Sequence, residues 1–168
     1  MKNVPSRFNL STRLILVIMG IVSVILLPLV FGCEGSYSQY YKNIPMLFTT
    51  IFSTLSVGLF IHSNGEWRLP AIFLILLSVC DMYRFPIIHY GAAILFFLLS
   101  TYAMWNDKRV NGFGKISLVL YFLFFIDLLI FELVQVLIIC IFHLIYVIKM
   151  FNIKLEKLII EEVIEEEK

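Results

Sequence analysis

Long runs of apolar residues, separated by short polar breaks, make up most of this 168-residue chain. Hydrophobic residues account for 61% of the sequence and charged residues for 15%, and the mean hydropathy is +0.95. A soluble domain of this length has one core, which cannot enclose so much apolar surface. The surroundings must therefore be lipid. The pattern predicts an all-α, polytopic membrane protein.

The number of membrane crossings follows from the lengths of the runs. A bilayer core about 30 Å thick needs roughly 20 helical residues per crossing, so five or six crossings fit. We expect a transmembrane domain over residues 1–151, with spans at about 14–31, 44–62, 69–83, 87–105, 116–129 and 133–151. The first run, behind Lys2, Arg7 and Arg13, also has the basic flank of a signal peptide. It is long for one, so we expect a retained anchor helix.

The stretch from Ile116 to Phe151 is too long for one crossing and short for two. Asp127, Glu132 and Gln135 interrupt it near the middle. The positive-inside rule separates the two arrangements, because cytoplasmic loops carry an excess of Lys and Arg. Six crossings divide the basic residues 11 to 2 between the inside and the outside, whereas five crossings divide them 7 to 6. We therefore predict six helices, both termini cytoplasmic, and a tight outer turn around Leu129 to Phe131.

The tail at 152–168 repeats apolar residues at spacings of three and four, which predicts a short amphipathic helix that continues the last span. Its lysines come first and its glutamates last, five of them among the final eight residues. Such a tail is either a solvated helix end or a docking helix for a protein partner. The sequence contains no basic stripe of the kind that binds nucleic acid.

Ionisable residues inside a membrane are costly, so each one needs a reason. In the six-helix arrangement four of them fall near the outer side of the membrane: Asp81, His89, Asp127 and Glu132. One interpretation is local, because Asp81 can pair with Arg84 on the same helix face and Glu132 suits a helix N-terminus. The other is an outward-facing polar pocket, in which His89 lies within hydrogen-bonding reach of at least one of the acids.

Carboxylates and imidazoles are also metal ligands, so a zinc-dependent hydrolase is an alternative for the same residues. Its candidate ligands are Asp81, His89 and His143, with Glu132 as a substitute. No second histidine follows His143 at a spacing of four, and no GxSxG or phosphate-binding glycine loop is present. The three cysteines, Cys33, Cys80 and Cys140, have no CxxC spacing and read as packing residues or lone thiols.

Small residues in the second run, Ser53, Thr54, Ser56 and Gly58, are typical of close helix packing in membranes. Ser78 and the run Gly91-Ala92-Ala93 read likewise.

The segment from Pro86 to Phe97, which reads PIIHYGAAILFF, resembles the fourth helix of the damage-regulated autophagy modulator family and of the related GPI-anchor-remodelling membrane proteins. Tyr102 and the pair Glu132-Leu133 fit the same pattern. The resemblance covers about 20 residues of that helix plus the Glu132 position. It implies six helices with cytoplasmic termini and a role in lipid organisation, lipid-anchor processing or membrane trafficking. His89 is the first position in this chain to which the resemblance assigns a functional role, and Glu132 is the second.

Three hypotheses follow. The leading one is a six-helix protein that binds or organises membrane lipid, with an outward-facing polar site around His89 and no cofactor. The second is a membrane-embedded, metal-dependent hydrolase of lipids or lipid anchors. The third is a non-catalytic structural or assembly subunit of a membrane complex.

Overall fold

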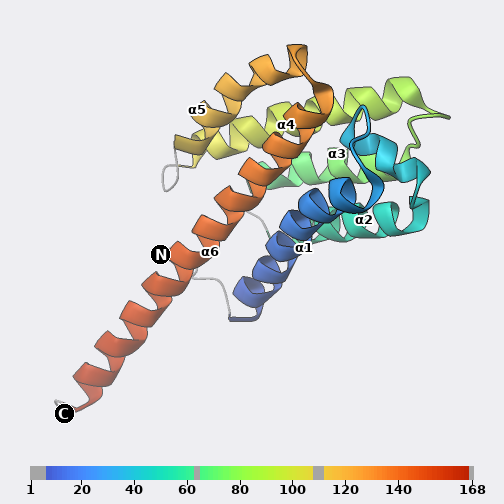
Figure 1. Ribbon diagram of the computed structural model, residues 1–168. Helices are drawn as coiled ribbons and strands as arrows, with labels where there is room; N and C mark the ends of the chain where they lie inside the picture. Colours follow the sequence, from blue (N-terminus) through green and yellow to red (C-terminus); the bar gives the residue numbers. More distant parts are fainter. Residues whose placement is uncertain (1–6, 63–64, 108–111, 167–168) are drawn as a thin grey trace.

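The computed structural model describes residues 7–62, 65–107 and 112–166, and these residues are almost entirely helical (Figure 1). Within the described ranges there are six α-helices, three short 3-10 helices and no strand. The α-helices are α1 (Arg7–Phe31), α2 (Pro45–His62), α3 (Arg68–Val79), α4 (Pro86–Asn106), α5 (Gly112–Val119) and α6 (Leu128–Glu166). The 3-10 helices are η1 (Tyr37–Lys42), η2 (Gly65–Trp67) and η3 (Leu120–Phe125). The all-α prediction is therefore confirmed for this part of the chain.

Proline and glycine mark several helix ends. Pro45 and Pro86 are the first residues of α2 and α4, where the missing N–H of proline leaves no hydrogen bond unmade. Helix α1 ends at Phe31, and the next residue, Gly32, has a φ of 78°, in the left-handed region that favours glycine. The Gly32 N–H donates to the carbonyl oxygen of Pro28 at 3.0 Å, which satisfies one of the last carbonyls of the helix.

Helices α2, α3 and α4 lie side by side, and α1 packs along α6 and against α2 (Figure 1). The distal end of the bundle is defined as the side where the last residues of α1 and α3 and the first residues of α2, α4 and α6 lie. The opposite end, where α1 and α3 begin and α4 ends, is the proximal end. The C-terminal half of α6 extends past the rest of the bundle at the proximal end (Figure 1).

Small residues allow the close helix contacts that the sequence predicts. A Cβ atom added to Gly58 would overlap Leu16 of α1, and one added to Gly20 would lie 2.7 Å from the Sγ atom of Cys140 on α6. Ser56 donates a hydrogen bond to the carbonyl oxygen of Ala71, and the hydroxyls of Ser53 and Ser78 lie 3.1 Å apart. Helix α2 therefore contacts both α1 and α3 through its small residues.

A buried polar network joins α4, α5 and α6. The Ser117 hydroxyl donates to Oε1 of Gln135 at 2.7 Å, and Nε2 of Gln135 donates to the Ser117 carbonyl oxygen at 2.9 Å. The Thr101 hydroxyl lies 2.6 Å from that of Ser117. Gln135, which interrupts the long apolar stretch in the sequence, thus has both ends of its amide satisfied inside the protein.

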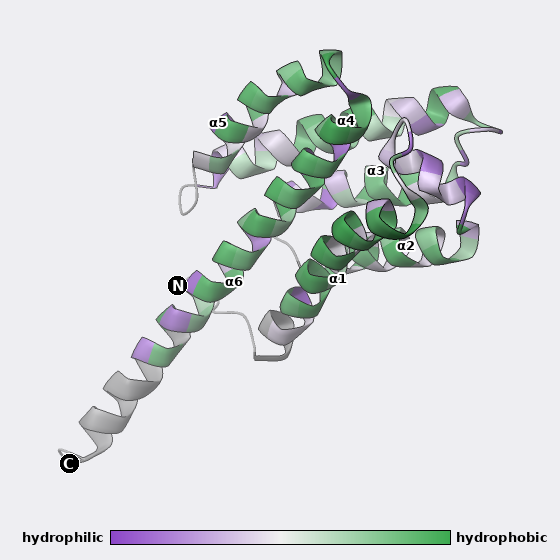
Figure 2. Ribbon diagram, viewed as in Figure 1, coloured by the Kyte–Doolittle hydropathy of each residue, from purple (hydrophilic) through white to green (hydrophobic). Residues whose placement is uncertain are grey.

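Hydrophobic residues make up much of α1, α5 and the first part of α6 (Figure 2), and many large apolar side chains of the bundle are exposed. Met46, Ile87 and Phe125 are 85%, 87% and 88% exposed. Exposed apolar area of this extent is unfavourable in water. In the part of the chain that the structure describes, three helices are long and apolar enough to cross a membrane: Ser11–Phe31, Pro86–Asn106 and Leu128–Ile153. Two shorter apolar segments are Pro45–Ile61 and Gly112–Phe125.

The boundary between the last two predicted spans needs a correction. The break between the helices lies at Ile126 and Asp127, whereas Leu129 to Phe131, where the sequence predicts the turn, belong to α6. The reason is capping, because Oδ1 of Asp127 accepts the N–H of Ile130 at 2.9 Å and starts the helix there. The preceding segment is not one regular helix, since η3 follows α5.

The third predicted span, 69–83, is also shorter in the structure, because α3 ends at Val79. The predicted helical continuation of the tail is present, since α6 runs to Glu166. The basic residues Lys2, Lys108, Arg109 and Lys168, which enter the charge count above, lie outside the described residues.

The close approach of a glycine to the backbone of a neighbouring helix generates a prediction. A Cβ atom at Gly114 of α5 would lie 2.5 Å from the backbone N and Cα atoms of Trp105 on α4, and a backbone cannot move aside as a side chain can. We expect Gly114→Ala to lower the free energy of unfolding by about 1–3 kcal/mol. Gly91→Ala is the control, because open space surrounds that position, and it should be neutral or stabilising by up to about 1 kcal/mol. Unfolding in mixed micelles measures both, and equal stability of the two variants would contradict the packing.

Candidate functional site

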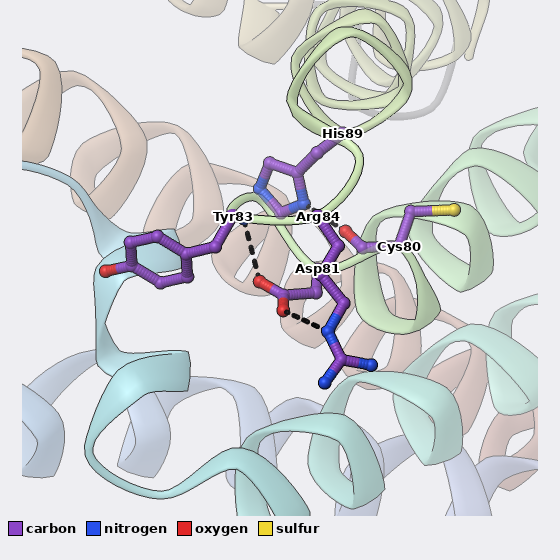
Figure 3. A network of polar contacts seen from close by, with 5 residues as sticks. All are labelled: Cys80, Asp81, Tyr83, Arg84 and His89. Atoms are coloured by element: carbon purple, nitrogen blue, oxygen red, sulfur yellow. Dashed lines mark hydrogen bonds and ion pairs between the residues drawn. The ribbon is translucent and has the colours of Figure 1, made fainter.

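Two of the four residues predicted to form a polar pocket lie close to the α3–α4 turn, Asp81 in the turn itself and His89 at the start of α4 (Figure 3). Oδ1 of Asp81 accepts the backbone N–H of Tyr83 at 2.8 Å, and Oδ2 lies 3.9 Å from Nε of Arg84. Nδ1 of His89 lies 2.7 Å from the carbonyl oxygen of Cys80. Because a carbonyl only accepts, Nδ1 is the donor. Both side chains therefore fix the local turn.

The other two residues have separate partners. Asp127 caps α6, as described above. Glu132 is 7% exposed, and its Oε2 accepts the backbone N–H of Tyr37 at 2.5 Å. The Tyr37 hydroxyl in turn donates to Oγ of Ser23 at 3.0 Å. Burial raises the pKa of that hydroxyl, so it stays protonated and able to donate. Glu132 thus holds η1 against the distal ends of α1 and α6.

The four residues are not brought together as a pocket. Across the described ranges, no hydrogen bond or ion pair joins any two of them. The prediction that His89 hydrogen-bonds one of the acids is therefore wrong in this structure. The physical reason is proximity along the chain: the nearest backbone groups satisfy Asp81, Asp127 and His89, and η1 folds back to satisfy Glu132. The local interpretation, an Asp81–Arg84 pair and a Glu132 near the start of a helix, matches these contacts.

The candidate metal ligands do not converge either. Asp81 and His89 lie at the distal end of α3, whereas His143 packs on Trp67, which directly precedes α3, with ring centroids 4.3 Å apart. The twelve residues of α3 separate the two places by about 18 Å. In the residues that the structure describes, no group of three or more His, Cys, Asp or Glu side chains is placed to hold a metal ion.

An interior cavity lies between α1, α2 and α6, with one residue each from α3 and α4. It contains about 660 Å³ of space free of protein atoms, part of it open at the surface. Almost all of its wall is apolar, formed by Leu16, Val17, Gly20, Phe52, Leu55, Gly58, Leu59, Leu74, Phe96, Val136, Ile139 and Cys140. Its length along α1, from Arg13 to Gly20, is about 10 Å.

Arg13 and His143 form the polar end of this cavity, toward the proximal end of the bundle. The Arg13 guanidinium lies over the ring of Tyr146, with its Cζ atom 4.9 Å from the ring centroid. His143 is 8% exposed, and within the described part of the chain its Nε2 atom has no hydrogen-bond partner. An apolar cavity that ends at a cation and an unsatisfied imidazole matches an amphiphile in shape and chemistry.

Sequence reasoning missed this site. It treated Arg13 as a topology signal, and it considered His143 only as a metal ligand. The two residues are 130 positions apart, so no spacing pattern connects them. One usable signal is present: His143 lies deeper in an apolar helix than the other candidates, where a buried polar side chain requires an explanation.

Comparison of the chain with models of protein families, with curated proteins and with solved structures found no significant match. The resemblance of the Pro86–Phe97 segment to the damage-regulated autophagy modulator family therefore stays a prediction.

The contacts in the α3–α4 turn predict unequal effects of two substitutions. His89→Ala removes the donor to the Cys80 carbonyl from a side chain that is only 3% exposed, so we expect a loss of about 1–3 kcal/mol of stability. Arg84→Gln should cost less than about 1 kcal/mol, because the Arg84 side chain is 83% exposed. Thermal unfolding in detergent measures both. A larger loss for Arg84→Gln would contradict the assignment.

Proposed function

We propose that this chain is an integral membrane protein that crosses the bilayer six times and binds lipid in its interior cavity. The observation that carries the proposal is the cavity itself, which is apolar, partly open and enclosed by helices with apolar outer faces. In a membrane, acyl chains surround such a cavity at high concentration. A lipid is therefore the most abundant apolar molecule that can enter it. This proposal keeps the leading hypothesis from the sequence and moves the lipid contact from His89 to the cavity.

The six crossings of the proposal use the three long helices together with α2, α3 and the α5–η3 segment. The last three are short for a bilayer core about 30 Å thick, and local thinning of the bilayer around short helices is a known adjustment of modest cost. Both termini then lie on the cytoplasmic side, together with the polar end of the cavity. The α3–α4 turn and η1 face outward.

Cysteine labelling tests this topology. Cys33 is exposed and lies at the distal end, so a membrane-impermeant maleimide should label it in intact cells in a Cys80→Ser/Cys140→Ser background. A variant with Cys33→Ser added and Glu156→Cys introduced should be labelled only after permeabilisation, because residue 156 is exposed and follows the apolar segment Leu128–Ile153. Labelling of Glu156→Cys from outside would contradict six crossings and favour five.

Native mass spectrometry tests lipid binding in the cavity. We expect protein extracted in mild detergent to retain lipid. Val136→Phe places an aromatic ring in the cavity wall and should weaken lipid binding about tenfold. A tenfold weakening corresponds to a loss of about 1.4 kcal/mol of binding free energy. Val57→Phe makes the same exchange at an exposed position on α2 and is the matched control. Equal lipid retention by the two variants would contradict binding in the cavity.

A further inference from the structure

The polar end of the cavity narrows the class of lipid that it fits. His143 lies in the cavity wall and is more than nine-tenths buried. Its Nε2 atom has no hydrogen-bond partner among the described residues. Buried polar atoms are normally satisfied, because an unmade hydrogen bond in an apolar interior costs free energy. A polar group of the occupant at this end would satisfy that nitrogen.

Arg13 sets the charge of that polar group. Its guanidinium is always protonated and presents five N–H donors in a plane that suits carboxylate and phosphate oxygens. The contact with the Tyr146 ring holds the guanidinium at the cavity. Five donors allow the side chain to keep its contacts within the protein and still bind an oxygen of an occupant. An occupant with a negatively charged end group is therefore favoured over a neutral one.

The apolar length of the cavity limits how much of the occupant it can enclose. The remaining wall residues are apolar along about 10 Å, which corresponds to part of one chain.

We propose that the cavity holds one acyl chain of a lipid whose anionic group, the carboxylate of a fatty acid or the phosphodiester of a phospholipid, lies between Arg13 and His143. This inference rests on the proposed function, since it names the kind of lipid that the cavity takes. The chain runs from the polar end toward Gly20 and Phe52, and its remainder leaves through the open side of the cavity.

Tryptophan fluorescence provides the test, because the chain has two tryptophans and Trp67 lies against His143. In a Trp105→Phe background, Trp67 reports on the polar end alone. Stearic acid with a nitroxide at carbon 5 should quench it saturably and more strongly than stearic acid with a nitroxide at carbon 16. The methyl ester of the carbon-5 probe lacks the negative charge, and its affinity should be lower by about tenfold or more.

Substitutions in the same background separate charge from fold. Arg13→Gln and His143→Leu should each weaken binding of the acid about tenfold, and Arg13→Lys, which keeps the charge, should retain most of it. Size-exclusion chromatography of each variant monitors folding. A phosphatidylglycerol with a nitroxide at carbon 5 of one chain distinguishes the sources: quenching by this lipid in preference to the acid assigns a phospholipid, and the reverse assigns a free fatty acid.

Two results would overturn the inference. Equal binding of the acid and its methyl ester, unchanged in Arg13→Gln, would show that the cavity takes lipid without regard to charge, and the proposed function would survive. Absence of saturable quenching by every probe, together with lipid retention that is unchanged in Val136→Phe, would remove both the inference and the proposed function.

Discussion

A lipid environment offers no hydrogen bonds, so every polar group inside the bundle depends on a partner from the same chain. The structure meets this constraint mostly through backbone groups. Gln135 bonds the hydroxyl and carbonyl of Ser117, and His89 donates to the carbonyl of Cys80. Glu132 accepts from the N–H of Tyr37. Most of the polar residues that interrupt the apolar runs thus join helices or order loops, and this leaves few of them free for chemistry.

His143 gives the molecule a candidate function because its unsatisfied nitrogen lies at the cavity. Nε2 of His89 is also buried without a partner among the described residues, but it does not line the cavity. His143 has the same burial as the structural polar residues, yet in the described part of the protein its Nε2 atom is unsatisfied. It also lies at a cavity that the surrounding helices do not fill. Gly20 and Gly58 bring α1 close to α6 and α2 at two points, and the larger side chains between those contacts leave the space. Close packing and the cavity therefore depend on the same helix surfaces.

The helical elements could largely be predicted from the sequence, because apolar runs and helix-starting prolines are local signals. The break before α6 was misplaced by a few residues, since Asp127 was counted as an interruption of the helix when it is the cap. The pairing of Glu132 with Tyr37, 95 positions away, could not be predicted, because it depends on how η1 folds over the bundle. The cavity was unpredictable for the same reason, since its wall draws on five helices.

The central claim is that the space between α1, α2 and α6 is a lipid site rather than a packing gap. The most direct test is a crystal structure grown from a lipidic mesophase. Our account predicts elongated density along the cavity, from Arg13 toward Gly20, with its polar end within hydrogen-bonding distance of Nε2 of His143. A cavity closed by Leu16 and Phe52, with no density inside and His143 bonded to a protein group, would contradict it.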